Sequence, residues 1–230
     1  LDAKKVILTL ADNTTNTITD SSRLSTEEDY SAVIYSKEDL IINGNGTLNV
    51  NAGYRNGIKS TDDCIIVSGT LNITSTEDGI IGKDLCGIVA GDININAGSD
   101  GIKSTYDTDT TKGNVIIEGG NITIKASNDG IQAENILVIN DGTINIKTNN
   151  GAADTTQTHI DNMDMGRGGF GFNNNKTTTT TDDTSESRKG IKAGNMLIIN
   201  DGDITIDSDD DSVHCNSVIY IWWYYKCSYR

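Results

Sequence analysis

Short segments in which apolar and polar residues alternate recur along this chain. In SGTLNITS (68–75), AGDININA (90–97) and GGNITIKA (119–126), Leu or Ile occupies alternate positions. A period of two is typical of a β-strand with one buried face, so each octet predicts one strand. The same pattern is present in NGTLNVNA (45–52), DGTINIKT (141–148) and DGDITIDS (201–208).

A Gly-Ile pair marks most repeats of this unit. The pairs begin at residues 57, 79, 101, 130 and 190, and the first three intervals are 22, 22 and 29 residues. A short apolar run also precedes each octet, so one unit supplies about three short strands and no helix. Because one unit cannot bury its apolar face alone, successive units must stack in parallel about 4.8 Å apart. The sequence therefore predicts an all-β fold, a single-stranded right-handed parallel β-helix with about six coils of roughly 22 residues.

Two other repeat folds fit this pattern less well. A propeller blade needs about 40 or more residues, whereas the unit here is nearer half that length. The calcium-binding nonapeptide repeat needs G-G-x-G-x-D runs, which the sequence lacks.

Two segments depart from the repeat. Residues 151–188 interrupt the fifth predicted coil with low-complexity sequence, including MGRGGFGFNNNK, and we expect a long flexible loop inserted at a turn. Residues 1–221 are then one β-helix domain that carries this insertion. The aromatic tail, residues 222–230, matches nothing upstream. A shifted reading frame across the codons of Trp222 and Trp223 would restore a repeat-like octet, so we consider a frameshift, with a genuine amphipathic cap as the alternative.

The composition narrows the class of partner. A formal charge of −15 and a pI near 4.3 argue against nucleic acid, whose phosphates select basic surfaces. The sequence has no apolar run of membrane-spanning length and no N-terminal signal-like segment, so membrane insertion is not expected and the chain resembles a mature product. Absence of proline and abundant Asn, Thr, Asp and Gly suit a water-exposed solenoid. We expect a secreted or cell-surface bacterial protein.

Stacking turns the residue before each Gly-Ile pair into a column of acidic side chains. Carboxylates spaced about 4.8 Å apart repel one another unless a cation lies between them. Calcium prefers six to eight oxygen ligands and accepts carboxylates together with backbone carbonyls. The alternative is that these turn residues are favoured only for local hydrogen bonding. The predicted calcium ligands are Asp78, Asp100, Asp129, Asp210 and Asp211.

A second column lies two residues after each glycine. Its lysines would lie outside the core and could meet the carboxylates of uronic acids, or could simply neutralise the acidic column. The candidate ligand-binding residues are Lys59, Lys103, Lys192 and His214. No catalytic triad or zinc-ligand spacing is present, and Cys64 and Cys86, at equivalent positions in adjacent coils, are expected to be buried free thiols rather than a disulfide.

Several segments together resemble a family of secreted bacterial carbohydrate-binding proteins, best known from cellulolytic clostridia. They are TLADNTTNTITD (9–20), YSKEDLIINGNGTLNVNA (35–52), NGIKSTDD (56–63), KGIKA (189–193) and DDSVHCN (210–216). The resemblance implies a polysaccharide-lyase-like parallel β-helix that carries calcium and binds cellulose or polygalacturonate. By position, it supports the same five aspartates as calcium ligands. This chain departs from the family at Cys215 and in its tail.

Three functions compete at this point. The first is a non-catalytic, calcium-containing carbohydrate-binding module for plant cell-wall polysaccharide, with acidic sugars favoured over cellulose because exposed aromatics are scarce. The second is a calcium-dependent pectate-type lyase in which Lys103 or Lys192 acts as the base, although an acidic column would raise a lysine pKa. The third is a surface adhesin or filament protein, whose uncovered solenoid ends could associate end to end.

Overall fold

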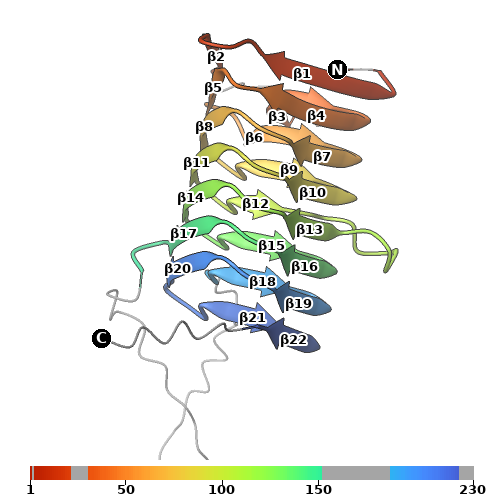
Figure 1. The fold of residues 1–230 in the computed structure, drawn as a ribbon, viewed down its shortest axis with the longest axis vertical. Helices are drawn as coiled ribbons and strands as arrows, with labels where there is room; N and C mark the ends of the chain where they lie inside the picture. Colours follow the sequence, from red (N-terminus) through yellow and green to blue (C-terminus); the bar gives the residue numbers. More distant parts are fainter. Residues whose placement is uncertain (2, 22–30, 152–186, 223–230) are drawn as a thin grey trace, which may run out of the picture.

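The structure, a computed structural model, describes residue 1 and residues 3–21, 31–151 and 187–222. Its strands form three parallel sheets that run side by side along one axis, as the stacked arrows of Figure 1 show. Among the described residues no helix is long and apolar enough to cross a membrane. The predicted all-β parallel solenoid is confirmed.

Sheet A contains β1 (Lys5–Leu10), β4 (Asp39–Gly44), β7 (Asp63–Ile66), β10 (Leu85–Ile88), β13 (Asn114–Ile117), β16 (Ile136–Ile139), β19 (Met196–Ile199) and β22 (Val218–Ile221). Sheet B contains β2 (Thr15–Asp20), β5 (Thr47–Ala52), β8 (Thr70–Ser75), β11 (Asp92–Ala97), β14 (Asn121–Ala126), β17 (Thr143–Thr148) and β20 (Asp203–Asp207). Sheet C contains β3 (Ala32–Ser36), β6 (Asn56–Ser60), β9 (Ile80–Gly82), β12 (Ile102–Lys103), β15 (Ile131–Ala133), β18 (Ile191–Ala193) and β21 (Val213–Cys215).

Each coil takes one strand from each sheet in the order A, B, C. The described part of the chain forms seven such coils followed by β22, compared with about six predicted. The difference arises because β1, β2 and β3 form a coil that has no Gly-Ile pair. Residues 152–186 of the predicted insertion and residues 223–230 of the tail lie outside the described residues.

The core is built from columns of identical or similar apolar side chains. In sheet C, Ile80 pairs with Ile58 on one side and Ile102 on the other, and all three are fully buried. Cys64 and Cys86 pair directly in sheet A as buried free thiols. Burial raises the pKa of the Cys86 thiol to about 12. The interior therefore repeats one apolar layer per coil.

The Gly-Ile motif reflects a close approach between coils. A Cβ atom on Gly101 would lie 2.4 Å from Cγ2 of Ile124 and 2.5 Å from the carbonyl oxygen of Gly130. Gly79 and Gly130 face equivalent contacts in their own coils. Glycine is required here because a side chain would push apart the core and the next coil.

A matched pair of glycine substitutions tests this explanation. Gly101→Ala should lower the free energy of unfolding by about 1–3 kcal/mol, as overpacking in a core does. At Gly87, the nearest atoms to an added Cβ lie 3.5 and 3.8 Å away, so Gly87→Ala should change stability by less than about 0.5 kcal/mol. Urea denaturation of the two variants measures the difference, and equal losses would contradict the close-packing argument.

Candidate functional site

The predicted calcium column is a ladder that links each coil to the next. The backbone N–H of Asp100 donates to Oδ1 of Asp78 (2.9 Å), and the N–H of Asp129 donates to Oδ1 of Asp100 (2.9 Å). Oδ1 of Asp129 accepts from the N–H of Lys189 (2.7 Å). Oδ1 of Asn56 likewise accepts a hydrogen bond from the backbone N–H of Asp78. The ladder therefore needs a side-chain oxygen but not a charge.

The lysine column neutralises two of these carboxylates. Nζ of Lys103 lies 2.6 Å from Oδ2 of Asp100, and Nζ of Lys192 lies 3.1 Å from Oδ2 of Asp129. Burial raises the pKa of Asp100, although Lys103 partly opposes the shift. Both oxygens of Asp100 and of Asp129 thus have protein partners, and calcium binding by this column remains a prediction. Lys59 instead donates to Oγ of Ser31 (3.1 Å).

The remaining predicted site residues form an ion-pair network in the last coil. Lys189 pairs with Asp210 and, at 3.3 Å, with Asp211. Nδ1 of His214 lies 3.1 Å from Oδ2 of Asp211. In strand register, His214 follows Lys192, so it continues the lysine column.

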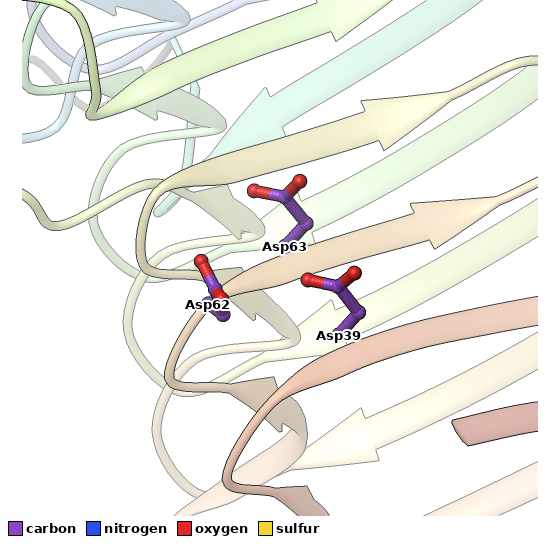
Figure 2. Close-up of side chains that lie close together, drawn as sticks. All are labelled: Asp39, Asp62 and Asp63. Carbon is purple, nitrogen blue, oxygen red and sulfur yellow. The ribbon is translucent and has the colours of Figure 1, made fainter. Parts of the chain in front are cut away.

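A different acidic cluster lies where the strands of sheet A begin. The carboxylates of Asp39, Asp62 and Asp63 approach one another within 4.8 Å (Figure 2). Asp39 and Asp63 are the first residues of β4 and β7, whereas Asp62 comes from the turn before β7. We call these three residues the acidic cluster. The sequence did not predict this cluster, because the coils were aligned on the residue before each Gly-Ile pair, a position that Asp39, Asp62 and Asp63 do not occupy.

Crowding of like charges changes how this cluster titrates. A hydrogen bond shared with Asp84, together with burial and nearby negative charge, raises the pKa of Asp62 to about 6. Burial and the charge of Asp39 raise the pKa of Asp63. Lys112 pairs with Asp84, and Nζ of Lys5 lies 3.7 Å from Asp39. The two lysines therefore pair with carboxylates on either side of Asp62 and Asp63 and not with these two residues themselves.

A shallow open cleft of about 450 Å³ adjoins the acidic cluster. Its lining combines carboxylates, hydrogen-bonding groups and apolar side chains. The lining residues are Asp62, Asp63, Asp84, Leu85, Thr111, Lys112, Asn114 and Ile116.

One wall of the cleft comes from the loop that precedes β13. Two ammonium groups lie near the Tyr106 ring, with Nζ of Lys83 at 4.9 Å and Nζ of Lys112 at 5.0 Å from its centroid. The backbone N–H of Tyr106 also donates to the carbonyl of Lys83 (3.0 Å). These contacts fix Lys112, and hence the cleft wall, against the preceding coil.

The raised pKa of Asp62 gives a pH-dependent prediction. Since the folded state binds this proton more tightly than the unfolded state, the free energy of unfolding falls as the pH rises from about 4 to about 6. In chelator at pH 7, Asp62→Asn should therefore raise the melting temperature, and the gain should shrink below about pH 5. Asp203→Asn, on the exposed face of β20, removes the same charge elsewhere and is the matched control for the loss of one charge. A lower melting temperature for Asp62→Asn at pH 7 would contradict the repulsion.

Comparisons with known proteins agree with this architecture. The chain is 39% identical over 75 residues to a carbohydrate-binding domain-containing protein of Acetivibrio thermocellus, a match that covers 31% of this chain and 26% of that protein. It thus spans about a quarter of the relative's length. The fold is similar to that of the polysaccharide lyase-like protein from C. thermocellum, solved as a gadolinium derivative, with a TM-score of 0.58 and 24% identity, over 94% of this chain and 68% of the other.

The family comparison covers almost all of the sequence. Residues 1–222 match the model of one family, which includes every described strand. The chain belongs to the family of carbohydrate-binding domain-containing proteins.

Proposed function

We propose that this chain is a secreted bacterial, non-catalytic carbohydrate-binding module for plant cell-wall polysaccharide, and that it favours acidic sugars such as polygalacturonate over cellulose. The cleft beside the acidic cluster carries the proposal. Carboxylates and the side chains of Thr111 and Asn114 can hydrogen-bond sugar hydroxyls, while Leu85 and Ile116 offer apolar contact. Such a mixed lining suits a sugar ring, which has both polar and apolar surface.

Calcium would link an acidic sugar to this acidic protein. It is a hard cation that takes six to eight oxygen ligands, and the acidic cluster offers three carboxylates within one ion's reach. A hydrogen bond with Asp84, burial and nearby negative charge raise the pKa of Asp62, and burial and nearby negative charge raise that of Asp63; a cation between the carboxylates would relieve the part that is due to like charge. Asp39, Asp62 and Asp63 would hold the ion, and the remaining ligand positions would be open to water or to a uronate carboxylate.

The aspartate column fits calcium less well than the acidic cluster does. Its inner members, Asp100 and Asp129, are nearly inaccessible and already bind backbone N–H groups and lysines. A cation there would have to displace Lys103 or Lys192. Uronate binding by these lysines or by His214 would likewise have to break their present ion pairs. We therefore favour the acidic cluster.

The lyase alternative needs a lysine with a lowered pKa beside the sugar. Although burial lowers it, the adjacent Asp100 carboxylate raises the pKa of Lys103 overall. The bond to Asp84 raises the pKa of Lys112, the lysine of the cleft. Burial lowers the pKa of Lys59, but Lys59 is not among the residues that line the cleft. These charges favour binding over proton abstraction.

An adhesin or filament function would require that the ends of the solenoid bind other molecules. Within the described residues, β1, β2 and β3 each have a strand neighbour on one side only, and Ile7 and Ile18 there are 58% and 38% exposed. An uncovered strand edge can pair with a strand of another molecule. End-to-end self-association therefore stands as a second proposal, which concentration-dependent sedimentation would detect.

Retention on polymer tests the carbohydrate-binding proposal. In affinity electrophoresis with calcium, the protein should be slowed by polygalacturonate more than by a soluble cellulose derivative, and a chelator should abolish the retardation. Asp62→Asn and Asp63→Asn should weaken the calcium-dependent binding about tenfold or more, which corresponds to about 1.4 kcal/mol.

Matched substitutions locate the cation. Asp203→Asn removes an exposed charge from sheet B and should bind like the wild type. Asp129→Asn keeps the ladder's acceptor oxygen but not its charge; a larger loss for Asp129→Asn than for Asp63→Asn would place calcium at the aspartate column instead. Unsaturated product formed from polygalacturonate would refute the binding-only function.

A further inference from the structure

The outer face of sheet A carries an apolar stripe that runs the length of the solenoid. The stripe is one column of outward side chains from seven strands, in direct register and interrupted once by Gly87. It consists of Ile7, Ile41, Ile65, Ile116, Val138, Ile198 and Tyr220. Ile7 and Tyr220, at the two ends, are 58% and 51% exposed, and the five members between them are partly exposed. A second outward column widens the stripe in the later coils, with Ile136, Met196 and Val218 in register.

The equivalent face of sheet B is entirely different. Its central outward column is polar, and its asparagines bond to one another, with Nδ2 of Asn72 at 2.9 Å from Oδ1 of Asn49 and Nδ2 of Asn94 at 3.1 Å from Oδ1 of Asn72. Asn145 and Thr205 occupy the same column in the coils that place Val138 and Ile198 on the stripe. Strand formation alone therefore does not demand apolar side chains outside sheet A.

A solvated sheet normally alternates apolar and polar residues, whereas a sheet covered on both faces has continuous apolar runs. The strands ILVI (136–139) and MLII (196–199) are of the continuous kind. Every described strand belongs to one of the three walls, so none of them lies over the outside of sheet A. A contiguous, partly exposed apolar surface that no described strand covers is typical of an interaction site.

The stripe is continuous with the proposed sugar cleft. Ile116 belongs to both, and Leu85, which also lines the cleft, lies on the same outer face. Gly87 leaves a notch at this junction, because an added Cβ would meet only ordinary contacts there. No charged side chain interrupts the stripe, in a chain whose net charge is −15.

The dimensions of the face favour a long polymer over a second copy of the chain. Eight strands about 4.8 Å apart, each about four residues long, give a footprint of about 34 by 13 Å, or about 450 Å². A stable protein interface typically buries about 800 Å² on each partner. The narrow, elongated shape instead matches an extended chain lying along the solenoid axis.

We propose that the apolar stripe is the platform on which an extended polysaccharide lies, with the C–H faces of successive sugar rings packed on its aliphatic side chains. This inference rests on the proposed function and extends it: the cleft holds one ring, and the stripe holds the rings that follow. Because burial of apolar surface supplies the stripe's share of the affinity, this share should grow with chain length and tolerate high salt.

Charge-introducing pairs on the two sheets of the same coils test the platform. Val138→Glu with Ile198→Glu places two carboxylates on the stripe, and Asn145→Glu with Thr205→Glu places two on sheet B of the same coils. Retention on insoluble polygalacturonate and on cellulose, in calcium and high salt, should fall at least tenfold for the first pair and stay within about twofold for the second. A third pair, Val138→Thr with Ile198→Thr, keeps the β-branched shape without adding charge and should also bind the polymers more weakly than the wild type. Circular dichroism checks that each variant is folded.

The outcomes separate the platform from the proposed function. If the wild type binds a polymer and both glutamate pairs bind it equally, the stripe plays no part and the platform is refuted, while carbohydrate binding stands. If the wild type binds neither polymer, both proposals fall. A dimer that dissociates in the Val138→Glu, Ile198→Glu variant while its glycan affinity is unchanged would assign the stripe to self-association instead.

Discussion

Each strand of this solenoid pairs with the equivalent strand of the next coil, so every residue has a counterpart about 4.8 Å away along the axis. This spacing suits some residue types and penalises others. Aliphatic side chains gain contacts in such a column, and Asn72 and Asn94 bond to the asparagine of the neighbouring coil. Carboxylates in the same relation repel, so each acidic column needs partners.

The two groups of acidic side chains solve this problem differently. In the ladder of Asp78, Asp100 and Asp129, one oxygen of each side chain accepts a backbone N–H of the next coil, and lysines neutralise two of the three carboxylates. Among the described residues, the acidic cluster has no comparable set of backbone donors. A hydrogen bond with Asp84, burial and like charge raise the pKa of Asp62, and burial and like charge raise that of Asp63. Carboxylates whose repulsion is neutralised by the protein's own donors and lysines have a structural role. Carboxylates whose repulsion is not neutralised favour the binding of a cation or a proton.

The sequence was sufficient for the fold because the repeat is local. Alternation in octets such as 90–97 predicted the strands of sheet B, and the Gly-Ile pairs predicted the direct register of Ile58, Ile80 and Ile102. The first coil was missed because β1, β2 and β3 lack that pair. The register also placed Lys103 in the column predicted for it, but which oxygen it neutralises depends on side-chain directions that no spacing specifies.

The acidic cluster was harder to predict, because it brings together the first residues of β4 and β7, which are 24 residues apart in sequence. A usable signal was present: Asp39, Asp63 and Asp84 each stand at or just before an apolar run of sheet A. When the coils are aligned on those runs rather than on the Gly-Ile pair, the carboxylates of Asp39, Asp63 and Asp84 fall at one edge of sheet A.

The same alignment changes how the apolar runs should be interpreted. A run such as ILVI was sufficient to predict a strand, but only alternate members, Leu137 and Ile139, are needed for the core. Ile136 and Val138 point the other way, and neither packing inside the coil nor β-propensity accounts for their column, since sheet B forms equally regular strands with Asn and Thr outside. An apolar residue that the core does not use, repeated at one outward position from coil to coil, belongs to an interaction that the solenoid makes with something else.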